Sequence, residues 1–185
     1  MRVIERESDL DEGIAALIAR EPRFAQAPRP PLRRSPAGFE GMVRIVAAQQ
    51  LPVAAAEVIR RRLAALGATD PTALMAIDDA ALRGAGLSRS KIRSLRALAA
   101  SGTDFAALRD APQEQAVATL TQAPGVGRWT AEIYLMFCLG RADVFAPTDL
   151  ALREGARMLF ELPDRPAPAA LDAMAEAWSP WRAVA

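Results

Sequence analysis

The chain has 185 residues, of which 51% are hydrophobic and 24% are charged, and its formal net charge is +1. This balance is typical of a globular protein and argues against intrinsic disorder. No apolar run reaches the roughly 18 residues that a membrane-spanning helix needs, and the charged N-terminal residues do not resemble a signal peptide. We therefore expect a cytoplasmic protein without a membrane partner.

The chain contains no histidine and a single cysteine, Cys138. Catalysis by a Ser-His-Asp triad or a Cys-His pair is therefore excluded, as is a Cys/His metal site. One cysteine cannot form a disulfide within the chain, which suits a reducing compartment. Any chemistry must use carboxylates, hydroxyls, arginines, backbone dipoles or the only lysine, Lys91.

Helical periodicity and capping residues predict a succession of helices, and no stretch shows the alternation of a β-strand. Ser8 is expected to cap the first helix, and Asp70, Asp78 and Ser88 are expected to cap later ones. A proline-rich connector over 22–36 separates the first two helices. The sequence thus predicts an all-α fold, with helices that include 8–20, 38–50, 53–66, 128–140 and 168–178.

The stretch from Arg83 to Arg96 carries several basic side chains and no acid. One interpretation is a solvated helix face, because charge runs are common on surfaces. The other is a phosphate site, formed by the turn at Gly86, the helix start at Ser88, and the side chains of Arg89 and Lys91.

One helix ends before a tight turn from Ala123 to Gly127, and a second apolar helix starts at Arg128. Gly125 and Gly127 suit a turn that needs unusual dihedral angles and bare backbone. The amides of such a turn can hold a DNA phosphate without reading the base sequence.

Trp129 and Asp149, which both follow this turn in the sequence, lead to a further prediction. Trp129 lies at the start of the second helix, and Asp149 follows 20 residues later (149 − 129 = 20). Thr148 is expected to be an N-cap, which would place Asp149 in the first turn of the next helix.

Four motifs, in order and without a gap, resemble the helix-hairpin-helix DNA glycosylase superfamily, and within it the 3-methyladenine DNA glycosylase II (AlkA) branch. They are Pro124-Gly125-Val126-Gly127, Trp129-Thr130-Ala131, Asp143-Val144-Phe145 and Pro147-Thr148-Asp149. The resemblance covers about 39–182. It implies a compact, two-lobed helical bundle of the HhH-GPD type. We expect a single domain over 1–185, with a helical lobe and wedge loop at 38–122, the hairpin at 120–140, and a second lobe from 1–37 and 141–185.

The resemblance implies that Asp149 is the catalytic carboxylate. A carboxylate beside the sugar stabilises the positive charge that develops when a base leaves, and can align the attacking water. The alternative is an acid that only complements the helix dipole. The resemblance places Trp129 in the base pocket, where an indole face attracts a cationic base. Aromatic residues at helical spacing, which are also typical of a core, are further pocket candidates: Tyr134, Phe137, Trp178 and Trp181.

Family members that also cut the DNA strand carry a Schiff-base lysine at the position of Trp129. A tryptophan cannot form that bond, so the resemblance implies a monofunctional enzyme that uses water as its nucleophile. No cofactor is expected to be required. The four-cysteine iron–sulfur loop of several relatives is excluded, because this chain has one cysteine.

The resemblance also implies the contacts with double-stranded DNA that contains a damaged base. Gln50 or Leu51 would be the wedge that fills the place of a flipped nucleotide. The alternative is a simple helix–helix turn with Leu51 in the core. The expected DNA-binding residues are Gln50, Leu51, Gly86, Ser88, Arg89, Lys91, Gly125, Val126, Gly127 and Thr130. The family hairpin also implies a structural Na⁺ or K⁺ on the backbone carbonyls of Thr121, Ala123 and Val126.

The implied function is that of a monomeric, monofunctional DNA glycosylase of base excision repair, associated with the nucleoid in a bacterium. It would excise alkylated bases of the 3-methyladenine or 7-methylguanine type by hydrolysing the N-glycosidic bond. Two alternatives stay open. A non-catalytic helix-hairpin-helix DNA-binding protein would have no use for Asp149. The same fold acting on deaminated or mismatched bases would need more hydrogen-bond donors for its neutral leaving groups.

Overall fold

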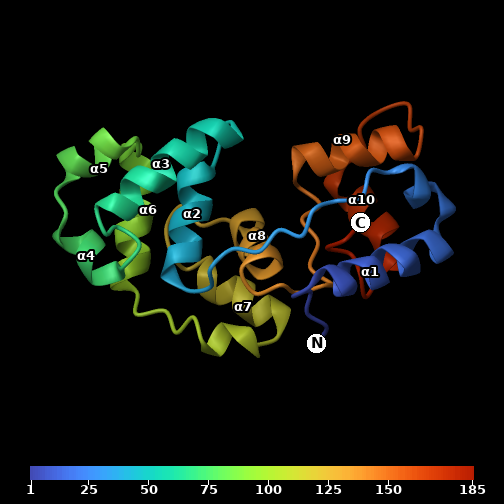
Figure 1. Cartoon of the computed structure of the whole chain (residues 1–185), viewed down its shortest axis with the longest axis horizontal. Helices are drawn as coiled ribbons and strands as arrows, with labels where there is room; N and C mark the ends of the chain where they lie inside the picture. Colours follow the sequence, from blue (N-terminus) through green and yellow to red (C-terminus); the bar gives the residue numbers. More distant parts are fainter. The chain divides into compact units, whose positions relative to one another are not determined.

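The computed structural model describes residues 1–185, and its regular elements are helices joined by turns and by longer loops (Figure 1). The all-α prediction is confirmed, since the only strand-like pairing is an isolated bridge between Val3 and Arg141. No helix is long and apolar enough to cross a membrane. The α-helices are α1 Glu7–Arg20, α2 Phe39–Ala48, α3 Val53–Ala65, α4 Pro71–Ala76, α5 Asp79–Ala85, α6 Arg89–Ala100, α7 Gln113–Leu120, α8 Arg128–Phe137, α9 Leu150–Leu159 and α10 Pro168–Ala175.

Capping side chains set three of the helix starts where the sequence predicts them. Asp70 accepts a hydrogen bond from the amide of Ala73, and Asp78 and Ser88 cap α5 and α6 in the same way. The predicted cap at Ser8 is wrong. Helix α1 starts one residue earlier, because the carboxylate of Asp9 folds back to accept the amides just before the helix.

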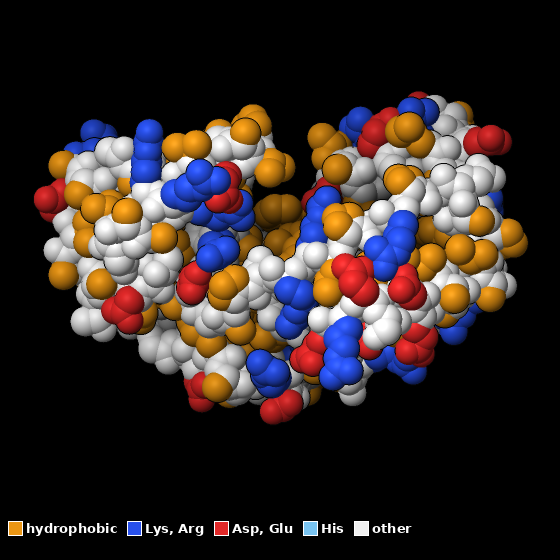
Figure 2. All heavy atoms as spheres, in the orientation of Figure 1, with side chains coloured by type: hydrophobic (Ala, Val, Ile, Leu, Met, Phe, Trp, Pro, Cys, Tyr) orange, Lys and Arg blue, Asp and Glu red, His pale blue; other side chains and the backbone are white.

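The chain forms two compact units. Residues Ser35–Tyr134 make the hairpin unit, and Met1–Arg34 together with Leu135–Ala185 make the terminal unit. Figure 2 shows basic and acidic side chains lying side by side over much of the visible face. Ion pairs such as Arg44 with Glu40 and Arg61 with Glu57 contribute to this mixed surface. It matches the near-zero net charge.

In the hairpin unit, α2 to α6 pack against one another around an apolar core, and α7 adds the fully buried Leu120. Helix α2 packs against α3 and α6, and α6 also packs against α4 and α5. The side chains that fill this core have no exposed surface, so each contributes its full hydrophobic transfer energy. They include Met42, Leu63, Leu74, Leu82, Leu95 and Leu120.

In the terminal unit, the core is built around Trp178. Its indole stacks on Phe160 with ring centroids 5.7 Å apart, and it meets Phe24 and Phe145 edge-on at 5.3 and 5.8 Å. These four rings come from segments far apart in the sequence, so they join α1, α9 and α10 into one body.

Replacing this central ring tests its structural role. We expect Trp178→Ala to lower the free energy of unfolding by about 3–5 kcal/mol, through lost burial and the cavity left behind. Val58→Ala, at a side chain on α3 that is 46% exposed, is the matched control and should change it by about 0.5 kcal/mol or less. Urea denaturation followed by circular dichroism measures both. A loss below about 1 kcal/mol for Trp178→Ala would contradict this account.

Candidate active site

The hairpin turn has an inward and an outward side. The side chains of Ala123 and Val126 are buried, and the amide of Val126 donates to the carbonyl of Ala123 at 3.0 Å. Gly125 and Gly127 are exposed. Gly125 has φ +81°, and a Cβ there would collide with the hydroxyl of Ser94 on α6, whereas a Cβ at Gly127 would meet open space. The turn thus needs glycine at 125 for both its conformation and its close packing.

A solvent-exposed ion pair links the two helices of the hairpin. At the start of α8, Arg128 donates to both carboxylate oxygens of Glu114 on α7, at 2.7 and 2.8 Å. It also donates to Glu132, which is only 3% exposed at its side chain, at 2.8 Å. The hydrogen bonds to Glu114 raise the pKa of Arg128 and lower that of Glu114. Sequence analysis missed this clamp, because Arg128 and Glu114 become neighbours only once the helices pair.

The predicted wedge turn follows α2. Gln50 has φ +58°, which is unusual outside glycine, and Leu51 is 37% exposed. Leu51 is therefore not the core residue of the alternative interpretation. The side-chain amide of Gln49 donates to the hydroxyl of Thr130 at 2.9 Å. Thr130 is 3% exposed and supports this turn from inside the protein, so its placement gives no support to the predicted DNA contact.

The turn between α5 and α6 has the expected helix start at Ser88. Gly86 has φ +111°, and a Cβ there would lie 2.8 Å from Ile59, so glycine is required. Of the two cations predicted to hold a phosphate, Arg89 is exposed. The ammonium of Lys91 instead donates to two carbonyl oxygens at the end of α2.

The structure brings the three stretches predicted to contact DNA together within the hairpin unit. Lys91 of α6 bonds the end of α2, and Gln49 after α2 bonds Thr130 of α8. Gly125 of the hairpin turn packs on Ser94 of α6. The wedge turn, the α5–α6 turn and the hairpin therefore support one another through direct contacts.

Asp149 belongs to the terminal unit and is itself the N-cap of α9. Its Oδ1 accepts hydrogen bonds from the amides of Ala151 and Leu152 at 2.9 and 3.1 Å. The prediction that Thr148 caps this helix is wrong, because Asp149 has the extended backbone of a cap and α9 begins at Leu150. The half-buried carboxylate is held at the positive end of the helix dipole.

A second aspartate fixes the start of the loop that carries Asp149. Asp143 accepts hydrogen bonds from the hydroxyl of Ser179 at 2.8 Å and from Arg182 at 2.8 and 3.0 Å. Burial alone would raise the pKa of Asp143, but the hydrogen bonds and charge of Arg182 outweigh it, so the pKa lies below its usual value. Val144 and Phe145 then pass through the core. Sequence analysis missed this anchor, because Ser179 and Arg182 lie 36 and 39 residues after Asp143 in the chain.

The aromatic residues predicted for the base pocket differ in environment. Trp129 is half-buried. Tyr134 has no exposed surface, its hydroxyl accepts the amide of Gly38 at 2.8 Å, and it lies in the hairpin unit. Trp178 and Trp181 are core residues of the terminal unit, in agreement with the core interpretation of these aromatics. Phe137 is half-buried and lines a small cavity against 30–34 of the same unit.

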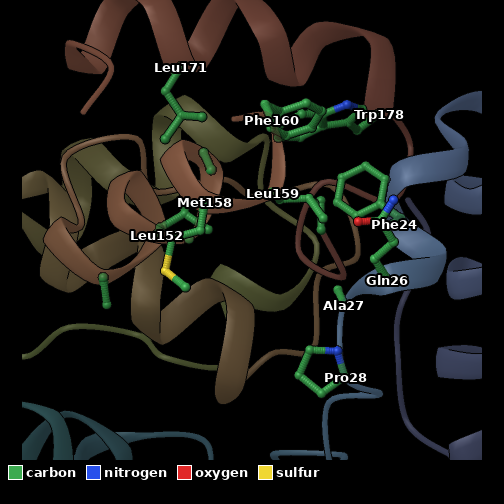
Figure 3. Close-up of a pocket in the computed structure, with 14 residues that line it drawn as sticks. Phe24, Gln26, Ala27, Pro28, Leu152, Met158, Leu159, Phe160, Leu171 and Trp178 are labelled. Atoms are coloured by element: carbon green, nitrogen blue, oxygen red, sulfur yellow. The ribbon is translucent and has the colours of Figure 1, made fainter. Parts of the chain in front are cut away.

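A cavity of about 440 Å³ lies within the terminal unit (Figure 3). Its walls are apolar apart from Gln26, and it contains Trp178 but not Asp149. Figure 3 shows Phe160 and Trp178 stacked at one side, with the ring of Phe24 near them. Without a charged side chain in its wall, this cavity offers no group for bond cleavage.

Metal-binding side chains are not clustered anywhere in the structure, since no three His, Cys, Asp or Glu residues converge. The hairpin offers backbone oxygens instead. Thr121 caps the end of α7, where helix carbonyls lack partners within the helix, and the carbonyl of Ala123 faces the turn amide of Val126. Such oxygen donors fit a hard alkali cation and not a soft transition metal.

The fold, the hairpin turn with bare glycines and the capped aspartate define a DNA-binding protein of the helix-hairpin-helix class. Residues 43–183 match the HhH-GPD superfamily base excision DNA repair protein family. The chain belongs to this superfamily, as the sequence motifs predict.

Three similar proteins illustrate the match. DNA-3-methyladenine glycosylase 1 of Schizosaccharomyces pombe is 33% identical over 156 residues, which cover 80% of this chain and 68% of that protein. The structure of the 3-methyladenine DNA glycosylase from the same yeast, in complex with abasic DNA, has a TM-score of 0.82 and 28% identity, and the match covers 94% of this chain and 92% of that one. A Bacillus halodurans DNA-3-methyladenine glycosidase has a TM-score of 0.79 and 32% identity, covering 100% and 88%.

The two hairpin glycines give a matched pair of variants. We expect Gly125→Ala to lower the free energy of unfolding by about 1–3 kcal/mol, because it adds both a strained φ and a collision with Ser94. Gly127→Ala should leave stability within about 0.5 kcal/mol. If the turn amides hold a phosphate, the added methyl group would crowd it, and binding to duplex DNA should weaken. Thermal unfolding and fluorescence anisotropy measure the two effects, and equal stability losses would contradict the distinction.

The anchor at Asp143 predicts a pH dependence. Because its pKa is lowered in the folded state, its stabilisation is present above the unfolded value of about 3.9 and is lost as pH falls through the folded pKa. The difference in unfolding free energy between the wild type and Asp143→Asn should stay constant above pH about 5 and shrink below pH about 4. Urea titrations over this range measure it, with Asp110→Asn, at an exposed position, as control. A constant difference down to pH about 2 would refute the role of this ion pair.

Proposed function

We propose that this chain is a monofunctional DNA glycosylase that releases alkylated bases by hydrolysing the N-glycosidic bond. The observation that carries the proposal is the carboxylate of Asp149, which two backbone amides orient at the start of α9. It ends a loop with the motif of a repair superfamily to which the chain belongs. The relatives named as 3-methyladenine glycosylases support the substrate class.

Asp149 is assigned the electrostatic step. As the bond between C1′ and the base nitrogen lengthens, the sugar gains positive charge. A carboxylate that is already oriented stabilises this charge without reorganising during the reaction. It then aligns or deprotonates the water that attacks C1′, and the products are a free base and an abasic site.

Trp129 is assigned to the base. A base alkylated on a ring nitrogen is cationic and leaves without strong general-acid help, which suits a chain that has no histidine. An indole face attracts such a cation by about 0.5–2 kcal/mol as water is removed. This attraction favours damaged over normal bases before any bond breaks.

The hairpin unit is assigned the grip on DNA. The amides of Gly125 to Gly127 would hold a phosphate, aided by an alkali cation on the carbonyls of Thr121, Ala123 and Val126. Gln50 or Leu51 would fill the place of the flipped nucleotide, whose extrusion costs a few kcal/mol and least for damaged bases. We infer that the protein acts as a monomer in the compartment that contains chromosomal DNA, the cytoplasm of a bacterium.

Lys91 bears on the choice between hydrolysis and strand cleavage. A lysine that forms a Schiff base must present an unprotonated amine to the sugar. The only lysine of this chain donates to two backbone carbonyls, which requires N–H groups and directs the ammonium into the protein. Its engagement supports water as the nucleophile.

A substitution that keeps the cap separates catalysis from folding. We expect Asp149→Asn to reduce single-turnover base release by about 100-fold or more, because the charge is lost while the amide oxygen can still cap α9. Binding to abasic DNA should stay within about threefold. The substrate is methylated duplex DNA, and released bases are identified by mass spectrometry.

Asp78→Asn is the matched control, because Asp78 caps α5 through the same kind of hydrogen bond. It should leave base release unchanged. If the wild type binds methylated DNA and releases no base, the chain is a DNA-binding protein without catalysis. Release of hypoxanthine or of a mismatched base in preference to methylated bases would favour the deaminated or mismatched class instead.

A further inference from the structure

The ammonium of Lys91 lies at the C-terminal end of α2, on the other side of a helix–helix contact. It donates to the carbonyl of Ala47 at 2.9 Å and to that of Gln49 at 2.7 Å. Carbonyls at the end of a helix have no amide partner within the helix and carry the negative end of its dipole. A cation from α6 therefore satisfies two acceptors that α2 leaves open.

The turn next to these carbonyls needs outside support. Gln49 leaves the helix with φ −50° and ψ 132°, and Gln50 then adopts φ +58°. Side chains other than glycine disfavour that region. Leu51 remains 37% exposed, so burial of its side chain holds the turn only in part. Two bonds from Lys91 and one between Gln49 and Thr130 are the contacts that tie it to α6 and α8.

The surroundings of Lys91 fit an internal contact. Its side chain is half-buried, and its hydrogen-bond partners are carbonyl oxygens, with no ion pair to a carboxylate. Desolvation lowers the pKa of Lys91 below its usual value. By contrast, Arg89, two residues earlier on the same helix, is exposed.

We propose that Lys91 is a positioning residue, whose ammonium holds the turn from Gln49 to Pro52 in the shape that enters the DNA stack. Through it, the helix that starts at the predicted phosphate site, Ser88 and Arg89, is coupled to the wedge. The inference rests on the proposed function, because the turn acts as a wedge only if the protein flips nucleotides. It replaces the expectation that Lys91 itself binds a phosphate.

The two roles differ in their salt dependence. Each cation that neutralises a phosphate adds about 0.9 to the slope of log affinity against log salt concentration. A cation bound to the protein's own carbonyls adds nothing to the slope. We therefore expect Lys91→Met to keep the wild-type slope on undamaged duplex DNA, whereas Arg89→Met should reduce it by about one.

The position of the wedge is measured separately. The probe is a duplex with 2-aminopurine opposite a tetrahydrofuran abasic analogue, whose fluorescence reports whether a side chain stacks beside the orphaned base. We expect Lys91→Met to lose most of the fluorescence change that the wild type produces. Single-turnover base release should fall about tenfold, because both charge-assisted hydrogen bonds to the turn are lost. Lys91→Arg keeps donors at this position and should recover part of both signals.

Two results would overturn the proposal: a slope for Lys91→Met that falls as much as for Arg89→Met, or a fluorescence change equal to that of the wild type. The fluorescence measurement needs no base release, so failure of the proposed function is seen separately, as a wild type that binds and stacks but liberates no base. If Lys91→Met does not fold, reductive methylation of the wild type provides the test. The Lys91 amine should react about tenfold more slowly in the folded chain than in urea, whether or not DNA is bound. Equal rates in the folded and the urea-unfolded chain would refute the internal contact. Slow reaction seen only when DNA is bound would refute it as well.

Discussion

The unpaired backbone groups at helix ends are the constraint on which this structure depends. The first amides and last carbonyls of every helix need partners from elsewhere, and in a fold of short helices such groups are numerous. Asp149 accepts the first amides of α9, and Lys91 donates to the last carbonyls of α2. Asp149 and Lys91, two of the side chains with functional assignments, thus also complete helices, so the hydrogen bonds that stabilise the fold orient these two groups.

The hairpin unit achieves its rigidity by mutual contact. Arg128 joins the two helices of the hairpin, and Gly125 allows the turn to pack directly on α6. A preorganised set of amides can bind a phosphate without first losing conformational entropy. This matters for a protein whose net charge is only +1, and whose acidic and basic side chains are mixed on the face that Figure 2 shows, because bulk charge then attracts DNA only weakly. Its affinity must come from well-placed groups rather than from bulk charge.

The lack of histidine limits the kind of leaving group that this chain can release. Without an imidazole, the chain has no neutral-pH general acid of the usual kind. A leaving group that already carries positive charge removes that need, since only the developing charge on the sugar remains to be stabilised. Under the proposed function, the oriented carboxylate of Asp149 supplies that stabilisation. The composition therefore favours a cationic leaving group, and the oriented Asp149 is compatible with it.

The sequence by itself determined the helical class, most helix starts, the hairpin with its two glycines, and the family. These features are local: caps, turns and motifs depend on residues a few positions apart. It also indicated Asp149, though it assigned the cap of α9 to the neighbouring Thr148. Threonine and aspartate are both good capping residues, so the local sequence does not show which of the two side chains accepts the helix amides.

Only the tertiary structure decided the partners of Lys91, the clamp between Arg128 and Glu114, and the anchor of Asp143 on Arg182. It also showed that Trp178 belongs to a core. The physical reason is the same in each case. A charged or aromatic side chain has the same local pattern whether it faces solvent, a ligand or another helix, and its partner is chosen when segments distant in sequence pack together.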